Sequence, residues 1–140
     1  MTTSDDERIV RAAVAAPAQL PEEVIARLGD ARVTALLGAA TALAFQRKFT
    51  ASPDRERTRE FTEVLQARFP DAAHLIKPVV IEALARFAFG ETDLIDGIEP
   101  EDVRTALFVL PYAIITEEQI QGEPLDQFVQ EVITAVDSPD

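Results

Sequence analysis

The only histidine in this 140-residue chain, His74, follows Asp71 at a spacing of three residues. In a helix this spacing places both side chains on one face, as in half of a carboxylate-bridged di-metal site. The second half would have to come from a symmetric partner. The chain has no cysteine, which excludes disulfides, thiolate zinc sites and cysteine nucleophiles. We therefore expect no metal site and no cofactor.

Other catalytic motifs fail on spacing. No serine lies in a Gly-x-Ser-x-Gly turn, and the five glycines are too far apart for a phosphate-binding loop. The acidic stretch 91–101 suggests calcium, but with Gly97 as the sixth loop residue Thr92, Leu94 and Val103 fall at ligand positions. The sequence therefore predicts a protein that is not an enzyme.

Three arginines, Arg55, Arg57 and Arg59, stand at every second position of the stretch SPDRERTREF. Acidic residues alternate with them, so that residues 47–70 carry a net charge of only +2. We expect mainly a solvated face with ion pairs. The functional alternative is that these arginines bind the acidic C-terminal part of the same or a second chain, because guanidinium groups pair well with carboxylates.

The formal net charge of −12 is unevenly distributed. Residues 1–90 carry 12 acidic and 12 basic side chains, whereas residues 91–140 carry 13 acidic side chains and Arg104 as their single base. Such a field repels nucleic acid and anionic lipid, and it favours solubility or a basic partner. We expect no nucleic acid or membrane partner, and a protein partner that is basic.

The segment AHLIKP, residues 73–78, resembles the Ala-His-x-Leu-Lys-Gly signature of phosphotransfer domains. The resemblance covers six residues, with Ile76 and Pro78 in place of the family's Leu and Gly. It implies that His74 is a phospho-acceptor on a helical bundle and that Lys77 neutralises the phosphoryl group. A proline at position 78 disfavours helix at Lys77 and places the pair in a loop or short turn ahead of the main helix.

The chain length fits a single domain, residues 1–140, with a core that needs neither metal nor disulfide support. The opening MTTSDDERIV carries acids where a secretory signal has basic residues. The longest apolar runs are shorter than the roughly 20 residues that span a bilayer. We expect a cytoplasmic protein.

Helix start and stop signals recur along the chain, and no sustained alternation indicates a strand. Ser4 and Glu7 form a capping box, Gly29 ends a helix, Asp30 caps the next, and Ser52 with Pro53 begins the arginine-bearing helix. The helices that we expect span residues 8–16, 21–28, 31–48, 53–69, 72–89, 100–119 and 124–136.

Three of the expected helices, those at 31–48, 72–89 and 100–119, contain segments that are apolar almost all round and must be buried on most sides. The fold class is therefore all-α, a compact bundle of about six or seven helices around three central apolar helices. Either the outer helices cover the central ones completely, or a second molecule covers part of them. We favour a homodimer.

The proline inside the expected helix 100–119, Pro111, removes one hydrogen bond near Leu107 and should bend or end the helix. Such a bend can open a pocket for an apolar ligand beside Phe108, with Tyr112 as its polar group.

Taken together, these patterns predict a non-enzymatic interaction or regulatory protein that associates with itself and presents an acidic C-terminal surface. Two alternatives remain open at this point. One is a helical sensor that binds a small apolar ligand at Phe108 and Tyr112, and the other is a phosphotransfer-like domain that uses His74.

Overall fold

The computed structural model describes residues 4–137, and every regular element in that range is helical. The prediction of an all-α bundle is confirmed. These residues form seven α-helices and three short 3₁₀ helices, which are labelled η. In chain order they are α1 Asp5–Ala15, η1 Pro17–Gln19, α2 Glu22–Leu28, α3 Asp30–Lys48, α4 Arg55–Arg68, η2 Pro70–Leu75, α5 Pro78–Phe87, η3 Ile95–Gly97, α6 Pro100–Glu117 and α7 Glu123–Asp137.

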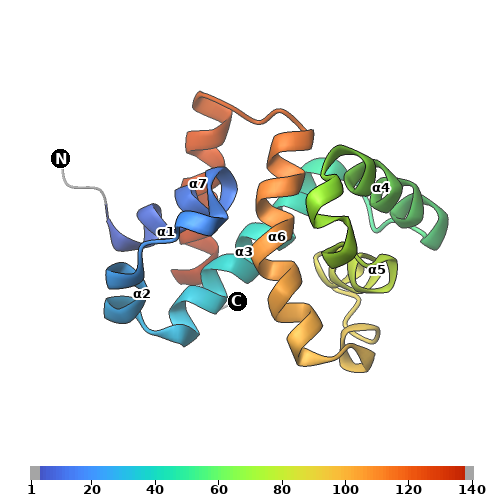
Figure 1. Ribbon diagram of the computed structural model, residues 1–140, viewed down its shortest axis with the longest axis horizontal. Coiled ribbons are helices and arrows are strands. Elements are labelled where there is room, and N and C mark those ends of the chain that lie inside the picture. Colours follow the sequence, from blue (N-terminus) through green and yellow to red (C-terminus); the bar gives the residue numbers. More distant parts are fainter. Residues whose placement is uncertain (1–3, 138–140) are drawn as a thin grey trace.

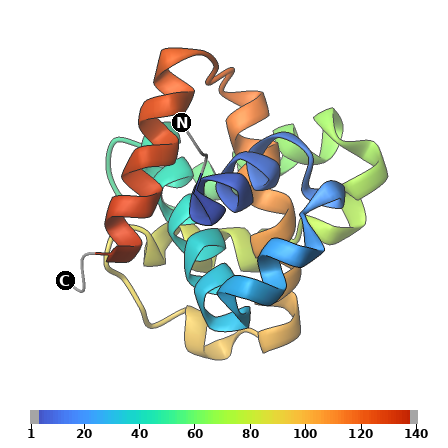
Figure 2. The same ribbon diagram turned by 90° about the vertical axis from the view of Figure 1, so that its left-hand side faces the viewer.

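The helices α3 and α6 lie side by side in the middle of the bundle (Figure 1). On one side α1, α2 and α7 cover them, and Figure 2 looks onto this side. On the other side α5 packs against α3 and α6, and α4 packs mainly against α5. The short helix η3 and the chain around it lie below α5 in Figure 1.

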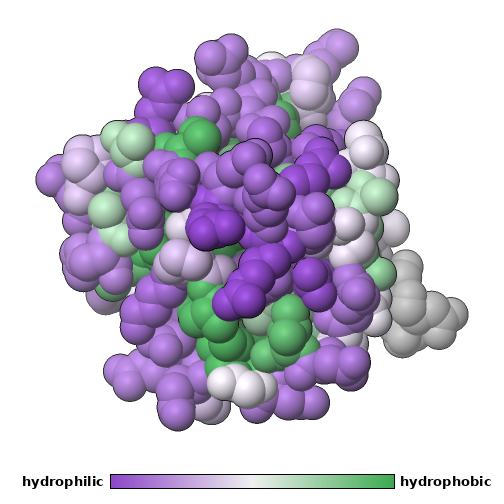
Figure 3. Space-filling view, turned by 90° about the vertical axis from the view of Figure 1, so that its right-hand side faces the viewer, coloured by the Kyte–Doolittle hydropathy of each residue, from purple (hydrophilic) through white to green (hydrophobic). Residues whose placement is uncertain are grey.

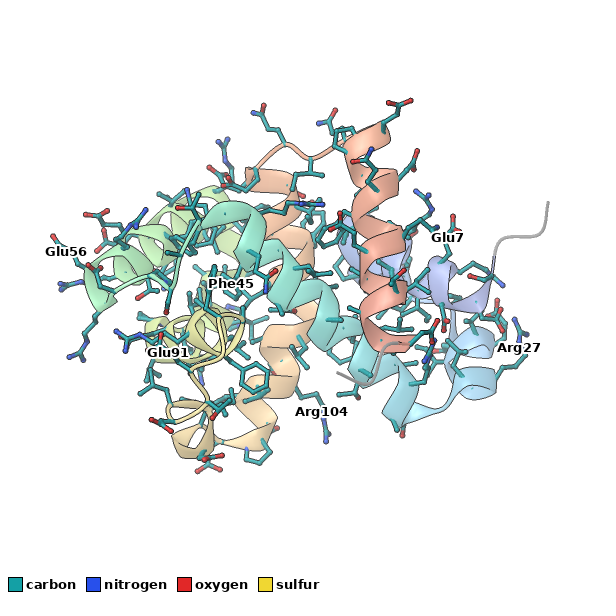
Figure 4. All side chains as sticks on the ribbon, turned by 180° about the vertical axis from the view of Figure 1, so that it is seen from behind. Glu7, Arg27, Phe45, Glu56, Glu91 and Arg104 are labelled. Carbon is teal, nitrogen blue, oxygen red and sulfur yellow. The ribbon has the colours of Figure 1, made fainter. Side chains whose placement is uncertain are left out.

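The core is one continuous cluster of apolar side chains from all seven α-helices. Burying a large aliphatic or aromatic side chain contributes roughly 1.5–3 kcal/mol. The largest side chains that are completely buried include Ile9, Leu36, Phe45, Leu65, Ile81, Leu110, Ile114 and Phe128. Figure 4 labels Phe45, whose ring lies parallel to that of Phe49 with the centroids 6.4 Å apart.

Several helix ends lie where the sequence predicts them. The Ser4 hydroxyl accepts a hydrogen bond of 3.1 Å from the backbone N–H of Glu7 at the start of α1. Gly29 has a φ of +91°, a conformation that favours glycine, and at this residue α2 and α3 turn by 106° relative to each other.

Two predicted caps were wrong by one or two residues. Asp30 is the first helical residue of α3 rather than its cap. Asp54, not Ser52, caps α4, where its side chain accepts a 2.8 Å hydrogen bond from the N–H of Arg57. The Ser52 hydroxyl instead donates to the carboxylate of Glu91. Pro53, between Ser52 and Asp54 in the chain, is buried, and α4 begins after it at Arg55.

The two internal prolines affect their helices differently, and the short turn predicted ahead of Pro78 is confirmed. The expected helix 72–89 is divided, because η2 ends at Leu75 and α5 begins at Pro78. Lys77 has extended backbone angles, as expected for a residue that precedes proline. Pro111, by contrast, does not end its helix, since α6 continues through it to Glu117.

Candidate functional site

A groove with a volume of about 530 Å³ lies between α3 and α6. Its walls come from α2, α3, the segment 95–100 and α6, and they are mostly apolar. We call it the apolar groove. Its lining residues are Ile25, Asp30, Val33, Thr34, Leu37, Ile95, Ile98, Pro100, Val103, Arg104, Leu107 and Phe108. A volume between about 300 and 1,000 Å³ with few polar groups is typical of small-molecule sites.

The structure separates the two residues that the sequence assigned to an apolar pocket. Phe108 lines the apolar groove and is 39% exposed. Tyr112 lies one turn further along α6, where its ring packs edge-on against Phe69 with the centroids 5.7 Å apart. Tyr112 is therefore not the polar group of this groove, a correction to the interpretation that joined the two residues.

Arg104 also lines the groove, and the sequence analysis did not identify it as a candidate binding residue. It is exposed and forms no ion pair with any residue between 4 and 137. In Figure 4 its side chain extends from α6 near the starts of α3 and α6 and ends toward solvent. The signal in the sequence was its isolation as the only base after residue 90.

The three arginines of α4 are exposed, but they do not form the ion pairs expected for them. Within residues 4–137, neither Arg55, Arg57 nor Arg59 pairs with a carboxylate. Arg57 lies on one flank of α4, with its guanidinium carbon 5.8 Å from the centroid of the Phe49 ring. Arg55 and Arg59 lie on another flank and line a depression of about 360 Å³ together with Val79 of α5.

Most of the acidic side chains of α6 and α7 are already paired within the chain. Five of them, and Glu118 directly after α6, contact bases from the first 90 residues: Lys77–Asp102, Arg68–Glu117, Lys48–Glu118, Arg11–Asp126, Arg47–Glu131 and Arg32–Asp137. The hydrogen bond that Arg68 donates to the carboxylate of Glu117 raises the pKa of Arg68 above its usual value. Fewer acidic side chains are therefore free to bind a partner than the charge of the C-terminal part predicts.

Uncompensated acidity is concentrated in residues 91–101, which we call the acidic segment. Its five exposed carboxylates form no ion pair within residues 4–137; they are Glu91, Asp93, Asp96, Glu99 and Glu101. The same segment supplies Ile95, Ile98 and Pro100 to the wall of the apolar groove. It thus presents acids to solvent and apolar side chains to the bundle.

The structure places His74 on η2 and Lys77 directly before α5, so the two residues do not share one α-helix. His74 is exposed. The ammonium group of Lys77 donates to the carboxylate of Asp102 over 2.9 Å. A phosphoryl group on His74 would therefore compete with Asp102 for this lysine.

Among residues 4–137, no group of three or more His, Asp or Glu side chains is placed to hold a metal ion. No single helix in this range is long and apolar enough to cross a membrane.

Comparison with known proteins gives no relative from which a function could be transferred. The chain matches no protein-family model, and it has no significant match among curated proteins or solved structures. The functional interpretation therefore depends on the surfaces described above.

Proposed function

We propose that this protein is a non-enzymatic interaction protein that associates with a second copy of itself. The observation that supports the proposal is the position of two unpaired charged surfaces of opposite sign. Arg55 and Arg59 on α4 and the acidic segment lie on the same side of the molecule, with α5 between them (Figure 1). Figure 3 looks onto this side and shows hydrophobic side chains surrounded by hydrophilic ones.

A two-fold arrangement makes such a surface complementary to itself. In a symmetric dimer, if a patch of one copy contacts a different patch of the other copy, the axis generates the reciprocal contact, so Arg55 and Arg59 of one copy can face the acidic segment of the other at two equivalent contacts. Exposed apolar side chains flank both patches, since Val79 beside the arginines is 60% exposed and Leu94 in the acidic segment is 40% exposed.

The apolar contacts are needed because exposed ion pairs contribute only about 0–1 kcal/mol each. A stable interface buries about 1,200–2,000 Å² in total, most of which must therefore come from contacts other than these charges. We infer that the charges set the orientation and the salt dependence of the dimer. Val79, Leu94 and their neighbours supply part of its affinity.

A charge-reversal pair tests this arrangement. The first variant carries Arg55→Glu and Arg59→Glu, and the second carries Asp93→Lys and Asp96→Lys. Each alone places like charges opposite each other in both contacts of the dimer, so each should be monomeric. Mixed together they restore opposite charges at both contacts and should form a one-to-one heterodimer.

A control that matches the second variant carries Glu22→Lys and Glu123→Lys, which change the net charge by the same amount and sign but lie on α2 and α7. It should associate like the unmodified protein. Sedimentation velocity on each variant and on the mixture gives the result. If the two reversal variants associate as well as the control, or if their mixture remains monomeric, the proposed interface is wrong.

A basic protein of another kind would bind the acidic segment by the same electrostatics, and salt would weaken that complex too. We propose a cytoplasmic location, since a chain without cysteine needs no oxidising compartment. The second candidate function is the binding of a small apolar ligand, which the apolar groove favours.

A further inference from the structure

A smaller hollow between α3, α5 and α6 adjoins the apolar groove. This inner hollow has a volume of about 170 Å³ and shares Ile95, Val103 and Leu107 with the groove. Its other lining residues include Gly38 and Phe87. The shared residues place the two spaces next to each other, with Arg104 lining the groove and Gly38 lining the inner hollow, and we call the two together the channel.

Gly38 lies in the middle of α3, where glycine weakens a helix relative to alanine. Its backbone does not need glycine, because only Gly29, Gly90 and Gly122 have positive φ among the glycines of residues 4–137. No heavy atom outside its own stretch of helix lies within 4 Å of the position that a Cβ would take. The missing side chain therefore leaves space in the inner hollow.

The polar groups of the channel are few, and Arg104 is its only basic lining residue. Its guanidinium has no carboxylate partner among the described residues, although Asp30 lines the same groove. Guanidinium groups bind carboxylates through two parallel hydrogen bonds. An anionic head group in the groove would supply the partner that Arg104 lacks.

We propose that this channel binds a single-chain alkyl carboxylate, with its carboxylate on Arg104 and its alkyl chain directed along the channel toward Gly38. The apolar walls suit a hydrocarbon chain. Asp30 is the one carboxylate among the lining residues, whereas the carboxylates of the acidic segment do not line the groove and act through solvent, where salt screens charges over about 8 Å. Arg104 would contact the head group directly, so its attraction outweighs their repulsion. The proposal does not rest on the proposed self-association, although the acidic segment contributes to both sites.

Calorimetric titration with decanoate tests the head-group assignment. Uncharged 1-decanol and cationic decyltrimethylammonium have the same alkyl chain, and all three are used below the concentrations at which they form micelles. Decanoate should bind most tightly. Arg104→Ala should weaken its binding by roughly tenfold to a hundredfold, the usual range for a hydrogen bond to a charged group. Arg8→Ala, at an exposed arginine of α1 that lies outside the channel and the proposed dimer interface, should leave the affinity unchanged.

A second variant, Gly38→Leu, tests the direction of the chain. Because a Cβ at this position meets open space, the variant should keep its helical circular dichroism and its cooperative unfolding. The leucine fills the inner hollow, so the preferred ligand should shift from decanoate toward hexanoate. No binding of decanoate, tighter binding of decyltrimethylammonium than of decanoate, or unchanged decanoate affinity in a folded Gly38→Leu would each overturn the proposal.

Discussion

Arg27 on α2 donates two hydrogen bonds to the carboxylate of Asp5 at the start of α1, with Nε to Oδ2 at 3.1 Å and Nη2 to Oδ1 at 3.0 Å. These hydrogen bonds lower the pKa of Asp5, and the charges of Arg27 and Arg8 lower it further. The same contact raises the pKa of Arg27. The pair fixes the first turn of α1 against α2.

The Asp5 contact predicts a specific dependence of stability on pH. The unfolded carboxyl takes up its proton near the usual pKa of about 3.9, whereas the folded one does so at a lower pH. The stability that the pair contributes is therefore complete above that value and is lost as the pH falls through the folded pKa. Asp5→Asn should flatten the acid limb of the unfolding free energy, measured with urea between about pH 7 and about pH 3.

Glu123→Gln is the control for this experiment, because Glu123 is exposed and forms no ion pair within residues 4–137. An identical acid limb for Asp5→Asn and Glu123→Gln would show that the Arg27 contact has no effect in solution.

Two glycine substitutions should change stability in opposite directions. Gly38 lies in the middle of α3, and a methyl group added there meets open space. Gly38→Ala should therefore stabilise the protein by up to about 1 kcal/mol, because alanine favours the helix more than glycine does. Gly29→Ala places a side chain at a φ of +91° and should destabilise by roughly 1–2 kcal/mol. Thermal unfolding of both variants checks the prediction, and equal shifts of the same sign would contradict it.

The phosphotransfer alternative predicts acid-labile phosphate on His74 after incubation with a small phosphodonor such as acetyl phosphate. Because Lys77 already pairs with Asp102, we expect no such phosphate on the unmodified protein. Asp102→Asn releases Lys77 from this ion pair, so phosphorylation of His74 is more favourable in this variant than in the unmodified protein. Phosphate that appears in either protein and disappears on His74→Ala would restore the alternative.

Local signals predicted most helix ends, because the capping groups act within a few residues. Ser4 and Gly29 are examples, and their geometry follows from their own backbone and nearest neighbours. The prolines were harder to interpret. Pro78 begins α5, whereas Pro111 lies inside α6, where it is buried in the core. Packing around α6 thus overrides the loss of one backbone hydrogen bond.

The candidate site was only partly predictable because it is made by contacts between distant segments. Phe108 was identified from the apolar pattern of its helix, but the groove beside it also needs Ile25 and Val33. Tyr112 was grouped with Phe108 because the two are one turn apart. The helix α6 meets α3 and the segment around η2 at different points along its length, so neighbouring turns face different surroundings.

The arginines of α4 show a second limit of sequence reasoning. Alternating acids suggested internal ion pairs, since residues three and four apart are neighbours on a helix. In the structure the ion pairs of the described residues that cross between helices involve other bases, such as Arg47 with Glu131. Which carboxylate each base contacts depends on the arrangement of the helices, which charge patterns alone do not determine.

The molar mass in solution tests the central claim of self-association most directly. Light scattering after gel filtration, over a range of protein concentrations and at low and high salt, should give twice the 15.3 kDa chain mass at high concentration and low salt. The mass should fall toward that of one chain on dilution or on addition of salt. A mass of one chain under every condition would contradict the claim that Arg55, Arg59 and the acidic segment bind a second copy.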